Sequence, residues 1–283
     1  MGTYAVTGSA SGMGGAAAAK LRAAGHTVIG VDLRDAEVTA DLSTLQGRRS
    51  AAEKVLAEAG GHLDGAVMAA GIGPMPGADR CRLIFQVNYF GVVDLLDAWR
   101  PALANAGKAK VVVVSSNSTT TTPLVPWRAV RALLHSEAAG AERALRLRPA
   151  APAMAYAASK IAVSRWVRRR AVTPEWAGAG IRLNALAPGA IMTPLLQQQL
   201  DDPGQARAVR AFPVPVGEYG DPGQLADWIV FMLSDAADFL CGSVIFVDGG
   251  SDAYLRSEDW PARVSAAGLP RYLTRFAKYR FKK

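Results

Sequence analysis

A tyrosine and a lysine four residues apart offer the first chemistry in this 283-residue chain. They are Tyr156 and Lys160, in the stretch "AYAASK". Residues at positions i and i+4 share one face of a helix, so the phenol and the ammonium can act together. A free tyrosine has a pKa of about 10, and a neighbouring positive charge lowers it toward the range in which proton transfer is efficient. Taken alone, however, the pair is better explained as one turn of an ordinary alanine-rich helix.

A glycine-rich turn near the N-terminus indicates a phosphate-binding site. The stretch "TGSASGMG" (7–14) follows a strand-like run and opens a helical pattern. Glycines let a pyrophosphate approach a helix N-terminus, where free N–H groups and the helix dipole favour negative charge. The P-loop pattern GxxxxGK[ST] is absent. We therefore predict dinucleotide binding, with a plain surface turn as the alternative. The residues concerned are Gly8, Ser11, Gly12, Met13 and Gly14.

An acidic residue after the second strand-like run points to the kind of dinucleotide. Asp32 lies 18 residues after Gly14. A carboxylate at this point accepts hydrogen bonds from the adenosine ribose and repels a 2′-phosphate, so NAD is favoured over NADP. Leu33, beside it, is included in the predicted cofactor site. Arg34 is the residue that favours NADP, because an arginine nearby can accommodate the 2′-phosphate. The stretch "DLRD" places it between two acids, however, so we interpret it as a solvated loop residue.

These candidates need a scaffold, and apolar runs that alternate with helical patterns predict one. The helical patterns include one ended by Gly25 and another that begins at Ser43 as N-cap. Alternating strands and helices predict right-handed βαβ units and a parallel sheet covered on both faces. We therefore expect an α/β, Rossmann-type doubly wound fold with seven parallel strands and a helical insert before the helix that carries Tyr156. The strand-like runs are 4–6, 27–32, 37–40, 65–70, 110–116, 181–187 and 243–247.

Composition limits the class of protein. We expect a single dinucleotide-binding and catalytic domain over 1–250, with an insert at 119–152 and a basic extension at 251–283. Two distant cysteines suggest neither a disulfide framework nor a zinc site, and no metal is expected. Without a secretory or membrane-spanning pattern, we expect a cytoplasmic protein. Seven of the eight excess positive charges lie in residues 261–283, which contain no acid.

Together, the motifs resemble the short-chain dehydrogenase/reductase family over roughly residues 3 to 250. Within the family, "AAGHTVIGVDLRDAEVTADLST", "PGAIMTPLL" and the insert are most similar to bacterial 3α-hydroxysteroid dehydrogenase/carbonyl reductases. The motifs that match in order and context are "TGSASGMG", "DL" (41–42), "NYFG" (88–91), "VVVVSS", "YAASK", "IRLNALAPGAIMTP" and "VDGG".

The resemblance implies a catalytic tetrad of Asn88, Ser116, Tyr156 and Lys160. Tyr156 would exchange a proton with the substrate oxygen, and Ser116 would hold that oxygen by a hydrogen bond. Lys160 would bind the nicotinamide ribose and act electrostatically on Tyr156. Asn88 would hold a water in a proton relay behind Lys160.

The roles of Ser116 and Asn88 each have an alternative. Ser115 or Ser118 is an alternative to Ser116, which we prefer because the family's catalytic serine is the second of the "SS" pair. Asn88 is alternatively a residue that only bonds the helix backbone.

The resemblance also extends the cofactor site beyond the glycine turn and Asp32. It implies contacts with adenine, the adenosine ribose, the nicotinamide ribose and the nicotinamide carboxamide. These residues are Asp41 and Leu42 at adenine, Ala70 and Gly71 at the adenosine ribose, Tyr156 and Lys160, and Pro188, Ile191 and Thr193 at the carboxamide.

Two departures from the family pattern stand out. The family's "NNAG" is replaced by "MAAG" (68–71), so two amides are missing and their contacts must be made otherwise. Ser116 and Tyr156 are 40 positions apart, where the family has a much shorter separation. We expect the helical insert to cover and shape an apolar substrate pocket and to contact another subunit, the alternative being a solvated decoration. His135 within it is interpreted as structural.

The expected function is NAD(H)-dependent interconversion of a secondary alcohol and a ketone on a bulky apolar substrate, with a hydroxysteroid preferred. An aryl or terpenoid alcohol is the alternative, and a non-catalytic nucleotide-binding regulator or scaffold is a further one. We expect a homodimer or homotetramer. For the tail, a cover over the pocket, an anionic membrane surface and nucleic acid are open, and we adopt a docked or frayed solvated terminus.

Overall fold

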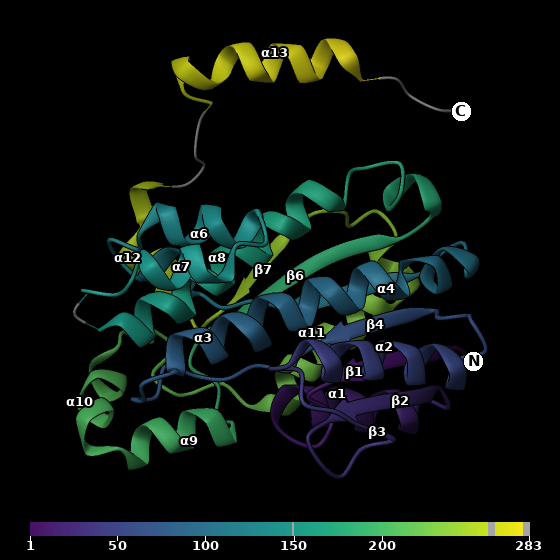
Figure 1. Ribbon diagram of the computed structural model, residues 1–283, viewed down its shortest axis with the longest axis horizontal. Coiled ribbons are helices and arrows are strands. Elements are labelled where there is room, and N and C mark those ends of the chain that lie inside the picture. The colour runs from purple at the N-terminus through teal and green to yellow at the C-terminus, as the bar shows by residue number, and fades with distance from the viewer. Residues whose placement is uncertain (149, 260–263, 280–283) are drawn as a thin grey trace.

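The computed structural model describes residues 1–148, 150–259 and 264–279. Within them a parallel seven-stranded sheet has the order β3-β2-β1-β4-β5-β6-β7 (Figure 1). The chain starts in the middle of the sheet, builds outward to β3, and then returns to β4 on the other side of β1. This confirms the doubly wound fold, and the reversal between β1 and β4 is where such sheets bind ligands. The strands are β1 (Thr3–Thr7), β2 (Thr27–Asp32), β3 (Val38–Thr39), β4 (Gly65–Met68), β5 (Lys110–Val114), β6 (Arg182–Pro188) and β7 (Val244–Val247).

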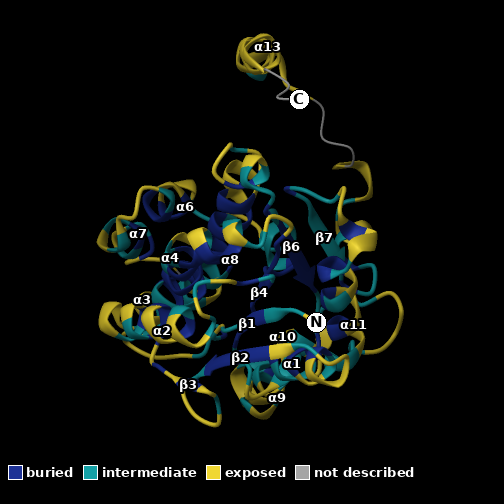
Figure 2. Ribbon diagram, turned by 90° about the vertical axis from the view of Figure 1, so that its right-hand side faces the viewer, coloured by how far each residue is buried: buried dark blue, intermediate teal, exposed yellow. Residues whose placement is uncertain are grey.

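Helices cover both faces of the sheet. One face is closed by α1 (Gly12–Ala23) and α11 (Pro222–Leu233), and the other by α2 (Leu45–Glu58), α4 (Gly91–Asn105) and α8 (Ala151–Arg170). The strands between them are the buried centre of the molecule (Figure 2). Because β4 and β5 are buried on both faces, they read as continuous apolar runs in the sequence.

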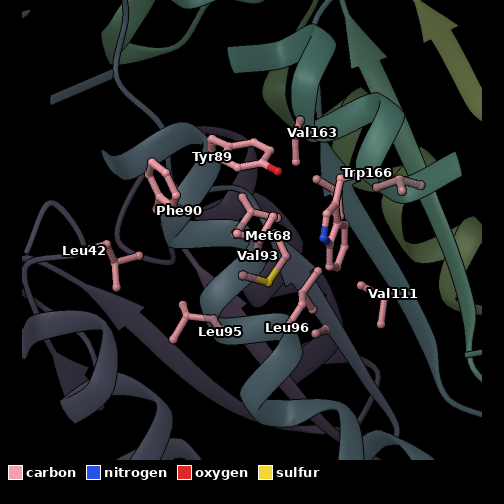
Figure 3. Packing of buried hydrophobic residues seen from close by; sticks show 14 of the residues in the cluster. Leu42, Met68, Tyr89, Phe90, Val93, Leu95, Leu96, Val111, Val163 and Trp166 are labelled. Atoms are coloured by element: carbon pink, nitrogen blue, oxygen red, sulfur yellow. The ribbon is translucent and has the colours of Figure 1, made fainter. Parts of the chain in front are cut away.

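The larger of the two cores lies between the sheet and α4 and α8. Met68 of β4 and Val111 of β5 meet Leu96 of α4 and Trp166 of α8 (Figure 3). The Trp166 ring also makes an edge-to-face contact with Trp176, at a centroid distance of 5.6 Å. This packing fixes the position of α8 against the end of β5, and α8 carries Tyr156 and Lys160.

Two local details differ from the sequence prediction. The N-cap of α2 is Thr44, not Ser43, because the Thr44 hydroxyl accepts a hydrogen bond from the Gly47 N–H. The long helical stretch before β5 is not regular, since α3 (Arg80–Phe85) passes into α4 through a π-helical turn, η1 (Gln86–Phe90). Such turns are common at functional sites, and this one contains Asn88.

The insert is helical, as expected, and forms several short helices. They are α5 (Ser118–Thr121), α6 (Trp127–Leu134) and α7 (Ala138–Arg143), and α6 packs against α7 and α8. The break comes at Ser136, whose left-handed backbone (φ 61°) cannot continue a helix. Residue 149 of the insert lies outside the described residues.

The chain after β6 first completes the body, and its last described helix, α13, then lies away from it. In Figures 1 and 2, α13 stands apart from the other elements. Residues 264–279 of the tail thus end in an undocked helix, so the docked form of the expected terminus is wrong, and the exposed residues of α13 agree with the solvated form. Arg263, Arg280, Lys282 and Lys283 lie outside the described residues. The remaining elements are η2 (Ala177–Ala179), α9 (Pro194–Asp201), α10 (Pro203–Ala211), η3 (Asp235–Ala237), α12 (Ser251–Leu255), η4 (Ser257–Asp259), η5 (Ala266–Gly268) and α13 (Leu269–Lys278).

Among the described residues, no helix combines the length and apolar character needed to cross a bilayer.

Candidate active site

One cavity of about 880 Å³ opens at the carboxyl ends of the central strands. Every residue predicted for the site lines it except Asn88, which lies behind it. Its walls come from the glycine turn, the ends of five strands, the first turns of α8, and α9 with α10. The sheet thus brings together residues from position 8 to position 193, as expected for a site at the switch point.

The glycine turn is shaped so that only glycine fits. Gly8 has a left-handed backbone (φ 71°), and a Cβ there would lie 2.8 Å from the Ala70 backbone nitrogen. A Cβ on Gly14 would lie 2.3 Å from the Gly8 carbonyl oxygen. The N-cap Ser11 makes no side-chain cap, and the first turn of α1 contains no acid. The helix N-terminus is therefore free to receive an anionic group, which fits a dinucleotide diphosphate.

Asp32 braces the same turn. One carboxylate oxygen accepts from the Ala10 N–H at 3.0 Å and the other from the Leu33 N–H at 2.7 Å. A carboxylate has about four acceptor sites, so it retains capacity for ribose hydroxyls. Arg34 is highly exposed, its carboxylate neighbour is Asp35 at 3.9 Å, and it does not line the cavity. The geometry therefore matches a ribose with free hydroxyls better than a 2′-phosphate.

Tyr156, Lys160 and Ser116 converge at the end of β5. Tyr156 and Lys160 lie one turn apart on α8, and the Lys160 Nζ is 5.8 Å from the Tyr156 ring centroid. Lys160 is buried and donates to the Val114 carbonyl oxygen at 2.8 Å. The Ser116 side chain is close enough to the Tyr156 phenol to influence its pKa, and both residues line the cavity. A phenol and a serine hydroxyl placed in this way can both reach a single substrate oxygen.

Burial is the largest influence on the pKa values of Lys160 and Tyr156. It lowers the pKa of Lys160 to about 8, since an ammonium is costly away from water. Burial also raises the pKa of Tyr156, and the hydrogen bond with Ser116 opposes the rise only in part. The prediction that Lys160 lowers the pKa of Tyr156 is therefore wrong for the protein by itself. Its ammonium is directed to the Val114 carbonyl, and at neutral pH Tyr156 is a phenol that can donate a proton.

The neighbouring serines have other surroundings. The Ser115 hydroxyl shares a hydrogen bond of 2.6 Å with the Ser164 hydroxyl and donates to the Lys160 carbonyl oxygen at 3.4 Å, so it points into α8. The Ser118 hydroxyl is buried without a hydrogen-bond partner among the described residues. Ser116 is thus the serine that interacts with the Tyr156 phenol, and its oxygen accepts from the Ser118 N–H at 3.1 Å.

Asn88 clamps the loop that follows β4. Its Oδ1 accepts from the Ile72 N–H at 2.9 Å, and its Nδ2 donates to the Ile72 carbonyl oxygen at 3.0 Å. The alternative of a bond to its own helix is therefore wrong. A Cβ on Gly71 would lie 3.4 Å from the Asn88 Oδ1 and 3.8 Å from the Lys160 Nζ. Because Gly71 has no side chain, the space beside both the Asn88 Oδ1 and the Lys160 Nζ stays open. The relay water itself stays a prediction.

A threonine makes one polar contact with the loop that carries "MAAG". The Ala70 N–H donates to the Thr7 Oγ1 at 3.1 Å, and Thr7 is buried at the end of β1. This bond ties β1 to the loop after β4, which also carries Gly71 and Ile72.

The far half of the cavity was not predicted from the sequence. It lies between the loop after β4 and the pair α9–α10, which follows Thr193. Two polar residues stand there, with the Gln199 amide donating to the Gln205 Oε1 at 3.3 Å. The signal was the amphipathic "PLLQQQL" after a threonine N-cap. The apolar lining residues are Ile72, Pro74, Pro76, Leu195, Leu196, Val209 and Phe212.

Among its described residues, the insert reaches the cavity near its two ends. Thr121 of α5 and Thr122 line it from one end, and Ala150 and Pro152 from the other. The helices α6 and α7 contribute no lining residue and pack against α8 and α3. The expected helical cover is therefore not made by α6 and α7; α9 and α10 form that wall. Nor do three or more His, Cys, Asp or Glu side chains gather into a metal-binding group in the described ranges.

The comparisons with known proteins agree with this fold. Residues 3–127 match the family model described as short chain dehydrogenase, and residues 138–252 match that described as enoyl-(acyl carrier protein) reductase. The chain belongs to the short-chain dehydrogenase/reductase family. It is similar to the 3-alpha-hydroxysteroid dehydrogenase/carbonyl reductase of Comamonas testosteroni, with 40% identity over 257 residues, 90% of this chain and 98% of the relative.

Two further relatives extend the comparison. The coniferyl-alcohol dehydrogenase of Pseudomonas sp. (strain HR199 / DSM 7063) is 32% identical over 259 residues, which are 87% of this chain and 94% of that protein. The crystal structure of the 3-alpha-hydroxysteroid dehydrogenase from Pseudomonas sp. B-0831, complexed with NADH, superposes with a TM-score of 0.84 at 43% identity. That match covers 90% of this chain and 99% of the other. The resemblance drawn from the sequence motifs is thus confirmed.

Proposed function

We propose that this protein is an NAD(H)-dependent oxidoreductase that interconverts a secondary alcohol and a ketone on a bulky apolar substrate, with a hydroxysteroid as the preferred class. One observation carries the proposal: Tyr156 and Ser116, whose side chains interact, line a single cavity that also contains the glycine turn and an apolar wall. The names of the relatives in Comamonas and Pseudomonas sp. B-0831 support the substrate class.

The cofactor's residues follow from the cavity. Asp32 and Leu33 would hold the adenosine ribose together with Ala70 and Gly71, and the first turn of α1 would hold the diphosphate. Asp41 and Leu42 would border adenine, and Pro188, Ile191 and Thr193 the nicotinamide. The NADH in the Pseudomonas sp. B-0831 relative supports NAD(H). When bound, the nicotinamide ring exchanges a hydride with the substrate carbon.

The chain's own residues handle the oxygen and its proton. In the reducing direction, Tyr156 donates its phenolic proton to the carbonyl oxygen while Ser116 donates a second hydrogen bond to it. A phenol with a raised pKa is in the correct protonation state for this step at neutral pH. In the oxidising direction, the same atom must first lose its proton.

Lys160 and Asn88 would carry the proton between Tyr156 and solvent. Lys160 has a pKa of about 8, so it can lose or hold a proton near physiological pH. The open point at Gly71 that Asn88 and Lys160 border supports a relay water there. Asn88 also holds Ile72, a lining residue, and so links the relay to the cavity wall.

An aryl alcohol is the second candidate substrate, because a coniferyl-alcohol dehydrogenase is among the relatives. Oxidation rates over a panel of steroid, terpenoid and aryl alcohols, with NAD⁺ and with NADP⁺, would distinguish the classes. We expect the steroids to give the highest kcat/KM with NAD⁺. No turnover of any secondary alcohol would contradict the proposed function.

Replacement of Tyr156 by phenylalanine separates an enzyme from a non-catalytic nucleotide-binding protein. Tyr156→Phe removes the proton donor and keeps the ring, so we expect at least about 100-fold loss of kcat with NADH affinity retained. Stopped-flow kinetics and NADH fluorescence measure the two. Unchanged turnover in Tyr156→Phe would contradict the assigned role.

Assembly and location are part of the proposal. We assign the reaction to residues 1–250, treat 251–283 as an extension, and expect a homodimer or homotetramer. Support for self-association comes from exposed aromatic residues near the edge strand β7, namely Trp228, Phe231 and Phe239. Cys81 and Cys241 are free thiols, which supports the cytoplasm. Sedimentation velocity and cell fractionation test these assignments.

A further inference from the structure

The helix α13 divides its side chains into two chemically opposite faces. Leu269, Tyr272, Leu273 and Phe276 recur at i, i+3, i+4 and i+7, which places them on one face. Arg271, Arg275 and Lys278 occupy the other face at i, i+4 and i+7. The helix is thus amphipathic over its whole length.

The apolar face has no cover in the described chain. Leu269, Tyr272, Leu273 and Phe276 are between 48 and 76% exposed, and no residue of α13 is buried. The helix stands away from the body in both views (Figures 1 and 2), and the family models end at residue 252. Large apolar side chains arranged on one exposed face mark an interaction surface.

The positive charge of the tail indicates which kind of partner binds the apolar face of α13. Residues 261–283 carry seven basic residues and no acid, while the other 260 residues have a net charge of about +1. A second copy of the tail would repel the first, and a nearly neutral body offers α13 no net opposite charge. Nucleic acid would satisfy the basic face and leave the apolar face in water. An anionic lipid surface satisfies both, because acyl chains accept the apolar residues while headgroups pair with the cations.

We infer that α13 binds the surface of an anionic bilayer. The helix lies in the interface plane with Leu273 and Phe276 buried at the acyl boundary. Arg271, Arg275 and Lys278 extend toward phosphate and carboxylate headgroups. The inference is independent of the proposed reaction, because α13 contributes no residue to the cavity.

Vesicle sedimentation of the full chain tests the inference. The probes are vesicles of phosphatidylcholine alone and vesicles with about 30% phosphatidylserine. We expect the chain to pellet with the anionic vesicles at least about tenfold more than with neutral ones at ~0.1 M salt, and to be released at ~1 M salt. Equal pelleting with both lipids would overturn the inference.

Substitutions on each face locate the contact. Phe276→Glu and, separately, a triple Arg271→Gln/Arg275→Gln/Lys278→Gln should each reduce anionic-vesicle binding by about tenfold or more. Tyr254→Glu is the matched control, because Tyr254 is an exposed aromatic residue on α12, away from α13, and it should bind like the wild type. NADH fluorescence should be unchanged in every variant and shows that each has folded.

Two results would reject the helix as the lipid contact. One is binding by Phe276→Glu equal to that of the wild type. The other is a fall in sedimentation mass of Phe276→Glu without lipid, which would mean that the apolar face packs against a second copy.

Discussion

At the scale of single residues, the site depends on what each polar atom is already bonded to. Tyr156 interacts with Ser116, Lys160 donates to the Val114 carbonyl, and Asn88 bonds Ile72. The motifs predicted the residue types and their convergence, because strand ends in a parallel sheet meet at one edge. The motifs did not predict the sign of the pKa shift of Tyr156. That sign depends on burial by side chains distant in sequence, and no local pattern records it.

The pH dependence of the two reaction directions follows from this sign. Because the pKa of Tyr156 is raised above its ordinary value, the proton donor persists through neutral pH and the base forms only in the alkaline range. We expect kcat/KM for ketone reduction to be flat near neutrality and to fall at alkaline pH, and kcat/KM for alcohol oxidation to rise as pH increases. Initial rates with NADH and NAD⁺ from pH 6 to about 10 measure both. Oxidation that is fastest below pH 7 would contradict the assignment.

At the scale of elements, each functional group is positioned by the junction between a strand and a helix. The turn from β1 to α1 receives the diphosphate, β5 ends at Ser116, and α8 presents Tyr156. Strand positions were predictable because buried parallel strands are continuous apolar runs. The cavity wall of α9 and α10 was not, since its helices are short and polar outside, and their tertiary partner is a loop after β4 more than 100 residues earlier.

The glycine turn gives a sharp test at this scale. In Gly14→Ala the new Cβ would clash with the Gly8 carbonyl at 2.3 Å, and the turn must open. We expect NADH affinity to fall by about tenfold or more, a loss of at least 1.4 kcal/mol, measured by fluorescence titration. The control is Gly178→Ala, whose Cβ would meet its nearest neighbour at an ordinary 3.5 Å. Equal affinity in the two variants would show that the turn tolerates a side chain.

The insert should contribute to stability more than to catalysis. Trp127 of α6 stacks on the guanidinium of Arg165 of α8, which lies 4.0 Å from a ring centroid. We expect Trp127→Ala to lower the free energy of unfolding by about 1–2 kcal/mol, as measured by urea denaturation, with KM and NADH affinity unchanged. Leu147→Ala, at a 92% exposed position in the same insert, should have no effect. A rise in KM with unchanged stability would instead mean that the insert shapes the substrate pocket.

At the scale of the whole molecule, the body and the extension have separate chemistries. The neutral body carries the cavity, while the basic extension carries an apolar face directed at solvent. Composition revealed the charge asymmetry at once. It did not reveal the undocked helix, because a sequence of alternating basic and aromatic residues is equally typical of a helix packed on the body. Only the positions of the surrounding elements distinguish the two.

Cofactor binding should stabilise the whole molecule and should do so selectively. A ligand at 100 times its Kd adds about 2.7 kcal/mol to the free energy of unfolding, which raises Tm by roughly 5–10 °C in a domain of this size. We expect this shift with NADH, and a much smaller one with the same concentration of NADPH, because Asp32 repels the 2′-phosphate. Differential scanning fluorimetry measures both. Equal shifts, or a larger one with NADPH, would contradict the role of Asp32.

The double duty of Asp32 has a consequence for protein engineering. Its carboxylate accepts the Ala10 N–H within the glycine turn as well as facing the ribose side of the cavity. An apolar replacement intended to admit NADPH therefore also removes the acceptor that holds the turn in shape. The residue that switches the coenzyme in this chain must keep an acceptor oxygen for the Ala10 N–H after the charge is removed, as asparagine or serine does.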